Sequence, residues 1–138
     1  MKTILFARVS TKDQAEDGYS LDSQRKLLED YSSQRTLFIT RRFIVPESAS
    51  GKLERKHFNE MLEYLYENPE IKIILCEKVD RITRNFKDAQ KIDEWLNEDT
   101  ERQIHFVKQN LVIHKNAKSH EKFQWDIYLV MARQYSNN

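Results

Sequence analysis

The apolar run KTILFAR at residues 2–8 is the part of the sequence that decides the fold. It is short and rich in residues that favour β-strands, and polar residues follow it, so it predicts a buried strand. Runs of the same character recur at residues 37–45, 72–77 and 103–107. The intervals between them are too long for hairpins, which indicates that a larger element joins each strand to the next.

Helical spacing of apolar residues fills these intervals. In the first, Ser20 is a good N-cap before a periodic segment. The periodic positions are Leu21, Gln24, Leu28 and Tyr31, then Phe58, Met61, Leu62 and Leu65, then Phe86, Ala89, Ile92 and Leu96. Alternation of strand and helix predicts an α/β domain with a mainly parallel sheet of four to five strands, helices on both faces and right-handed crossovers. Functional sites in such sheets lie at the carboxyl ends of the strands.

The last segment, residues 119–135, is expected to be one helix with two apolar stripes. Such a helix requires a partner for its second face, so we expect it to mediate self-association. Residues 136–138 contain no helix stop signal, which favours continuation of the helix beyond the chain. One stripe comprises Phe123, Ile127, Val130 and Met131, and the other Trp125, Tyr128 and Leu129.

Composition limits the possible classes of protein. With 138 residues, 39% hydrophobic and 33% charged, the chain is typical of one compact globular domain rather than a disordered one. A net charge of +1 means that any contact with nucleic acid must be local. Cys76 lies in an apolar run, so we expect it to be buried and unreactive. Neither a signal peptide nor a membrane span is recognisable, which predicts a cytoplasmic location.

Arg8 and Ser10 form the first candidate site, at the end of the first strand. Side chains alternate along an extended chain, so the two residues lie on the same side and could share one phosphate. By itself this pattern is more typical of a turn or a helix cap than of catalysis.

The second candidate site follows the third strand and contains Asp80, Arg81 and Arg84, with Asn85 available to cap the next helix. An ion-pair cluster around Asp80 is one interpretation. However, one carboxylate cannot neutralise both guanidinium groups and Arg8 as well. Excess arginine at the mouth of a sheet suits a phosphate, because guanidinium offers paired donors and remains charged.

A third candidate site is the polar stretch at residues 47–52 after the second strand, followed by Arg55. It would add hydroxyl groups and a fourth guanidinium to the same edge of the sheet. A loop ordered by substrate and a solvated loop are equally compatible with this composition.

Together these motifs resemble the resolvase/invertase family of serine recombinases. The resemblance is carried by residues 7–14, 20–24, 49–51, 55 and 79–84. It implies that Ser10 becomes joined to a DNA 5′ phosphate, and that Asp80 orients an arginine or donates a proton. It also implies that Arg8, Arg55, Arg81 and Arg84 bind the scissile phosphate, supported by Gln14, Gln24 and Ser50.

The resemblance further implies a domain organisation and partners. Residues 1–118 would be the catalytic domain, residues 119–138 the start of a dimerisation helix, and the DNA-binding region would lie outside this chain. Double-stranded DNA would be the substrate, and dimers would pair into tetramers. The extra residues 15–19 look more like large serine recombinases, whereas residues 131–136 lack the Glu-Arg pair that the family often has in this helix.

No metal or other cofactor is expected, because Asp80 has no neighbouring carboxylates for a two-metal site and the four His fit no common zinc spacing. Arginines would stabilise the developing charge instead. The base for Ser10 is either a water bound to arginine or Asp80. The alternative function is a non-catalytic oligomerisation module that docks phosphate; a phosphatase or esterase is disfavoured because Gly-x-Ser-x-Gly is absent.

Overall fold

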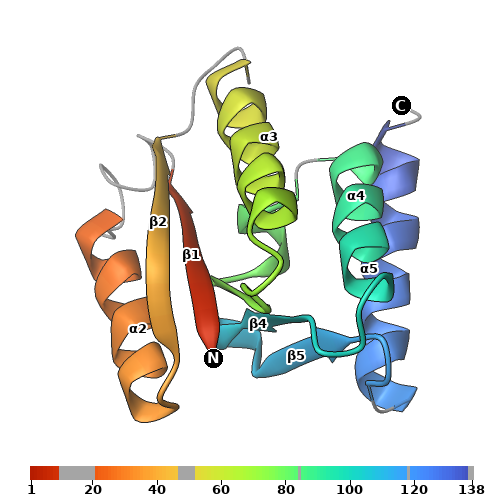
Figure 1. Ribbon diagram of the computed structural model, residues 1–138. Helices are drawn as coiled ribbons and strands as arrows, with labels where there is room; N and C mark the ends of the chain where they lie inside the picture. The colour runs from red at the N-terminus through yellow and green to blue at the C-terminus, as the bar shows by residue number, and fades with distance from the viewer. Residues whose placement is uncertain (10–20, 47–51, 84, 118, 137–138) are drawn as a thin grey trace.

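The computed structural model describes residues 1–9, 21–46, 52–83, 85–117 and 119–136. Its centre is a five-stranded sheet with the order β2-β1-β3-β4-β5 (Figure 1). The first four strands are parallel and β5 is antiparallel to β4, which confirms the predicted mainly parallel sheet. The strands are β1 (Lys2–Val9), β2 (Phe38–Pro46), β3 (Ile73–Cys76), β4 (Gln103–Phe106) and β5 (Leu111–His114).

Helices cover both faces of the sheet, as predicted. On one face lies α2, and on the other lie α3, α4 and α5 (Figure 1). Two 3₁₀ turns, η1 (Val79–Arg81) and η2 (Val107–Gln109), follow the ends of β3 and β4. The helices are α2 (Leu21–Gln34), α3 (Lys52–Glu67), α4 (Phe86–Asn97) and α5 (Ser119–Ser136).

The alternation of side chains along β1 divides the core into two clusters. Leu5 and Ala7 pack with Leu28 of α2. Ile4 and Phe6 face the other way, into the larger cluster that includes residues from α3, α4 and α5. A strand that is apolar on both faces is what a parallel sheet covered by helices requires.

The two apolar stripes of α5 have different surroundings. Trp125 is fully buried, its ring stacks on Phe106 at 6.0 Å between centroids, and its indole N–H donates to Asp93 at 2.9 Å. Tyr128 and Leu129 pack against the same core. The other stripe remains exposed, with Phe123 at 64%, Ile127 at 43%, Val130 at 58% and Met131 at 49%.

The position of the fifth strand is the main feature that the sequence did not locate. The expected strand at residues 103–107 ends at Phe106, and η2 turns the chain back. Asn110 closes this turn with φ of 49°, a left-handed conformation that asparagine tolerates better than most residues. Four residues then pair antiparallel with β4, from Leu111 opposite Phe106 to His114 opposite Gln103.

Candidate active site

The carboxyl end of β1 is held by a side chain from α2. The backbone N–H of Arg8 donates to Oε1 of Gln24 at 3.0 Å, and Nε2 of Gln24 donates to the carbonyl of Arg8 at 3.0 Å. Gln24 is fully buried, and Arg8 is 6% exposed. One amide thus replaces the two hydrogen bonds that a neighbouring strand would give, and it fixes the backbone two residues before Ser10.

The side chain of Arg8 connects β1 to the turn after β3. Its Nη2 donates to the backbone carbonyl of Asp80. The carboxyl group of Asp80 is on an exposed residue. Arg8 therefore lies close to the Asp80 turn, as expected. The hydrogen bond that joins them is accepted by the main-chain carbonyl of Asp80 and not by its carboxylate.

Buried residues and backbone hydrogen bonds hold the turn that carries Arg81. The N–H of Arg81 donates to the carbonyl of Lys78 at 3.1 Å. Thr83 donates to the carbonyl of Val79 twice, through N–H at 3.1 Å and through Oγ1 at 3.0 Å. Val79, Ile82 and Thr83 are all buried. Arg81 is therefore presented by a backbone with little freedom.

Asn85 caps the helix that follows, as expected. Its side chain accepts a hydrogen bond from the N–H of Asp88 at 2.9 Å, which satisfies a donor of the first turn of α4. The cap therefore defines where α4 begins.

Glu77 is a component of this edge that sequence reasoning missed. It directly follows the four buried residues of β3 and is itself 1% exposed. Its Oε1 lies 3.8 Å from Nε of Arg81, and its Oε2 lies 4.0 Å from Nζ of Lys108. Burial raises the pKa of Glu77, an effect that Lys108, Arg81 and Lys78 oppose. A charged residue immediately after an apolar strand was the available signal.

The remaining predicted site residues are Arg55 and four residues outside the described part of the chain. Ser10, Gln14, Ser50 and Arg84 lie outside the described residues. Arg55 is exposed near the start of α3, which begins at the end of the sheet where β1 and β2 finish (Figure 1). The structure therefore brings together Arg8, Gln24, Asp80 and Arg81, and places Arg55 on the helix next to that edge.

Histidine and cysteine have packing roles in the described part of the chain. His105 is buried in β4, and its two ring nitrogens contact Tyr31 Oη at 2.7 Å and Gln103 Oε1 at 2.9 Å. Cys76 is buried, which raises the pKa of its thiol to about 12 and makes it unreactive. Among the described residues, no group of three or more His, Cys, Asp or Glu could hold a metal ion.

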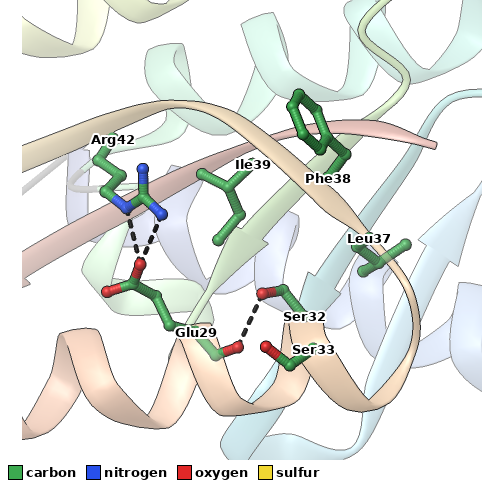
Figure 2. A pocket seen from close by; sticks show the side chains of 7 residues that line it. All are labelled: Glu29, Ser32, Ser33, Leu37, Phe38, Ile39 and Arg42. Atoms are coloured by element: carbon green, nitrogen blue, oxygen red, sulfur yellow. Dashed lines mark hydrogen bonds and ion pairs between the residues drawn. The ribbon is translucent and has the colours of Figure 1, made fainter.

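A pocket lies elsewhere, between α2 and the start of β2 (Figure 2). It has a volume of about 250 Å³ and contains none of the predicted site residues. Arg42 donates to Glu29 across its rim at 2.6 Å, and Ser32 donates to the carbonyl of Glu29 at 2.8 Å. Its position at the amino-terminal end of β2 separates it from the arginines at the carboxyl ends of the strands. The lining residues are Glu29, Ser32, Ser33, Leu37, Phe38, Ile39 and Arg42.

Comparison with known families gives a match over almost the whole chain. Residues 3–138 match the family described as Resolvase, N terminal domain. The chain belongs to the resolvase family. Family membership confirms the predicted resemblance and makes the chain a domain of a serine site-specific recombinase, an enzyme that acts on DNA.

Solved structures support the same fold for this resolvase-family chain. The N-terminal catalytic domain of TP901-1 integrase is 17% identical, with a TM-score of 0.70 over 95% of this chain and 93% of that one. A resolvase family site-specific recombinase from Streptococcus pneumoniae is 22% identical, with a TM-score of 0.68 over 95% of this chain and 87% of that one. No curated protein matches in sequence. Within the described residues, none of the helices is both long and apolar enough to cross a bilayer.

Proposed function

We propose that the chain cleaves and rejoins double-stranded DNA through a covalent bond between Ser10 and a 5′ phosphate. The observation that carries the proposal is the contact from Arg8 to the Asp80 carbonyl, because it brings the guanidinium-bearing ends of β1 and η1 to one edge of the sheet. Ser10 follows Arg8 by two residues. A hydroxyl beside several guanidiniums is suited to phosphoryl transfer.

In the proposed reaction, the Ser10 hydroxyl oxygen attacks phosphorus and its proton leaves to a base. The bond from phosphorus to the 3′ oxygen breaks, and that oxygen takes up a proton to give a free 3′ hydroxyl. Arg8, Arg55, Arg81 and Arg84 stabilise the charge that develops on the phosphate oxygens, and loss of one such donor costs roughly 3 kcal/mol in transition-state stabilisation. One phosphoester replaces another, so reversal reseals the DNA without ATP.

Asp80, Gln14, Gln24 and Ser50 are proposed to support this site. Asp80 would orient an arginine or donate the proton to the leaving oxygen, while Gln24 holds the backbone of Arg8 through its two hydrogen bonds. Gln14 and Ser50 are assigned by the family resemblance. Residues 1–118 form the catalytic part, and residues 119–138 begin a helix that serves dimerisation.

Self-association is proposed to use the exposed stripe of α5. Phe123, Ile127 and Val130 place apolar surface on the helix face opposite Trp125, and such a continuous stripe is typical of a protein contact. Dimers that pair into tetramers would hold two DNA sites together for exchange. By the family resemblance, sequence-specific DNA contacts are proposed to lie outside residues 1–138.

The test is formation of a covalent adduct by the full-length gene product with DNA that carries the junctions flanking its gene. Wild-type protein is expected to give a protease-sensitive species on a denaturing gel, and Ser10→Ala to give none. Ser33→Ala, at an exposed serine of α2, is the matched control and should retain the adduct. An adduct of normal yield from Ser10→Ala would refute the assignment, and its absence from wild type would favour a phosphate-docking module.

A further inference from the structure

Glu77 has an unusual environment for a carboxylate. It is 1% exposed, and neither carboxylate oxygen accepts a hydrogen bond from any group in the described part of the chain. The backbone around it is nevertheless well held, because its carbonyl accepts a hydrogen bond from the N–H of Lys108 at 3.0 Å. The side chain is therefore fixed in place but is not satisfied by hydrogen bonds from described groups.

Four charged groups surround this carboxylate. Arg81 approaches to 3.8 Å and Lys108 to 4.0 Å. Lys78 also attracts the negative charge, and Asp80 repels it. Arg81 is 18% exposed and Lys108 is 40% exposed at their side chains, so each cation extends from the buried carboxylate towards solvent.

This arrangement is unfavourable for folding alone. A carboxylate taken out of water without hydrogen bonds loses several kcal/mol of hydration, and ion pairs at such distances recover only part of it. An apolar residue of similar size after β3 would avoid that loss, and a neutral glutamine would reduce it. The retention of a carboxylate beside Arg81 therefore points to a use of its charge rather than to stability.

We propose that Glu77 is a positioning residue for Arg81. The ionised carboxylate of Glu77 holds the guanidinium of Arg81 at the carboxyl edge of the sheet, where this guanidinium can contact the scissile phosphate. The inference rests on the proposed function for the role of Arg81, and on the 3.8 Å contact for the role of Glu77. Lys108 shares the same carboxylate and limits its movement. Glu77 itself does not touch the reacting atoms.

Protonation of Glu77 should change the rate of cleavage and the stability of the fold in opposite directions. Acidification protonates Glu77 and releases Arg81, so cleavage should fall. Because burial raises the pKa of Glu77, the folded state binds this proton more readily than the unfolded state. The contribution of this group to stability is therefore greatest below the ordinary carboxyl pKa and decreases as the pH rises through the raised one. A residue with only a structural ion pair would lose stability and activity together.

The experiment compares Glu77→Gln and Glu77→Asp in the full-length gene product, with adduct formation followed from pH 5 to 8. We expect Glu77→Gln to slow adduct formation at neutral pH by up to about a hundredfold, the scale on which a misplaced binding group acts, and to change the acid limb of the profile. Its melting temperature should be equal to or higher than that of wild type. Glu77→Asp should recover part of the rate.

Glu29→Gln is the matched control, because Glu29 pairs with Arg42 at 2.6 Å and Arg25 at 3.1 Å away from the strand ends. It should leave the rate and the pH profile unchanged. The proposal is overturned if Glu77→Gln cleaves at the wild-type rate, or if it loses rate and melting temperature together with an unaltered pH profile.

A second measurement needs no DNA and separates this proposal from the proposed function. In the 138-residue chain, the Nε–H resonance of Arg81 should shift with pH in step with protonation of Glu77, and the shift should vanish in Glu77→Gln. A resonance that does not respond to pH would refute the inference. If it responds while wild-type protein forms no adduct with DNA, the proposed function fails and the pairing of Glu77 with Arg81 stands.

Discussion

Gln24 shows how a single side-chain amide can satisfy the backbone near the end of a buried strand. Its two hydrogen bonds to Arg8 occupy both backbone groups of a buried residue one position before the end of β1. Helical spacing predicted only that Gln24 lies on the inner face of a helix, and the family resemblance added a supporting role. The structure supplies the reason, because a buried glutamine must find partners and the end of β1 needs them.

Replacement of Gln24 by methionine should test this role. Gln24→Met keeps the volume but leaves the N–H and the carbonyl of Arg8 without these partners, so the free energy of unfolding should fall by about 1–3 kcal/mol. Urea denaturation measures this change. Gln34→Met, an exposed position on the same helix, should alter stability by less than about 0.5 kcal/mol. Equal effects at the two positions would contradict the role of Gln24.

For the arginines at the strand ends, the sequence predicts that they lie near one another but not which groups they contact. Strand order was sufficient to predict that Arg8 and the Asp80 turn meet, because parallel strands end at one edge. The partner within each contact could not be predicted. Arg8 contacts a carbonyl, and Arg81 has Glu77 as a carboxylate neighbour. Such choices depend on side-chain direction and burial, which sequence spacing does not define.

At the scale of elements, long helices were predictable and short pieces were not. The two stripes of α5 could be separated from their spacing, and the structure confirms both. By contrast, β5 has only four residues and is preceded by a 3₁₀ turn with Asn110 in a left-handed conformation. Too few residues lie in these pieces for periodicity to identify them.

A buried histidine connects α2 to β4 and gives a prediction at this scale. The ring of His105 lies between two polar groups, with Nδ1 at 2.7 Å from the Tyr31 hydroxyl and Nε2 at 2.9 Å from Oε1 of Gln103. Burial, with Arg35 and His114 nearby, lowers the pKa of His105 from 6.5 to about 4. Neutral His105 should therefore make its full contribution to the free energy of unfolding above pH 6.5. Up to about 3 kcal/mol of this free energy should be lost as the pH falls through 4.

Urea unfolding of wild type and His105→Asn from pH 7.5 to 4 would measure this contribution. The two free-energy curves should converge as the pH falls, since the variant lacks the titrating ring. His120→Asn, at a residue exposed on α5, is the control and should change the free energy of unfolding at pH 7.5 by less than about 0.5 kcal/mol. A constant separation between wild type and His105→Asn would show that the histidine does not titrate differently in the folded state.

At the scale of the whole molecule, the charge balance limits what this domain does alone. The net charge is +1. At the strand ends, the carboxylate of Glu77 lies close to the cationic side chains of Arg81 and Lys108 and offsets part of their charge. We expect the 138-residue chain to bind DNA without sequence preference and with a dissociation constant in the range of roughly 10⁻⁴ to 10⁻⁶ M. Fluorescence anisotropy with flanking-junction and scrambled duplexes would measure it. Tight binding that prefers the junction duplex would contradict this expectation.

The outer edge of β2 affects how copies of this protein can meet. Its pairing with β1 shifts register between Thr3 and Ile4, so Thr40 is an extra residue that bends the strand. Arg41 and Arg42 follow at once, and both are exposed. A bent strand edge that carries two exposed arginines is a poor template for pairing with the strands of another molecule.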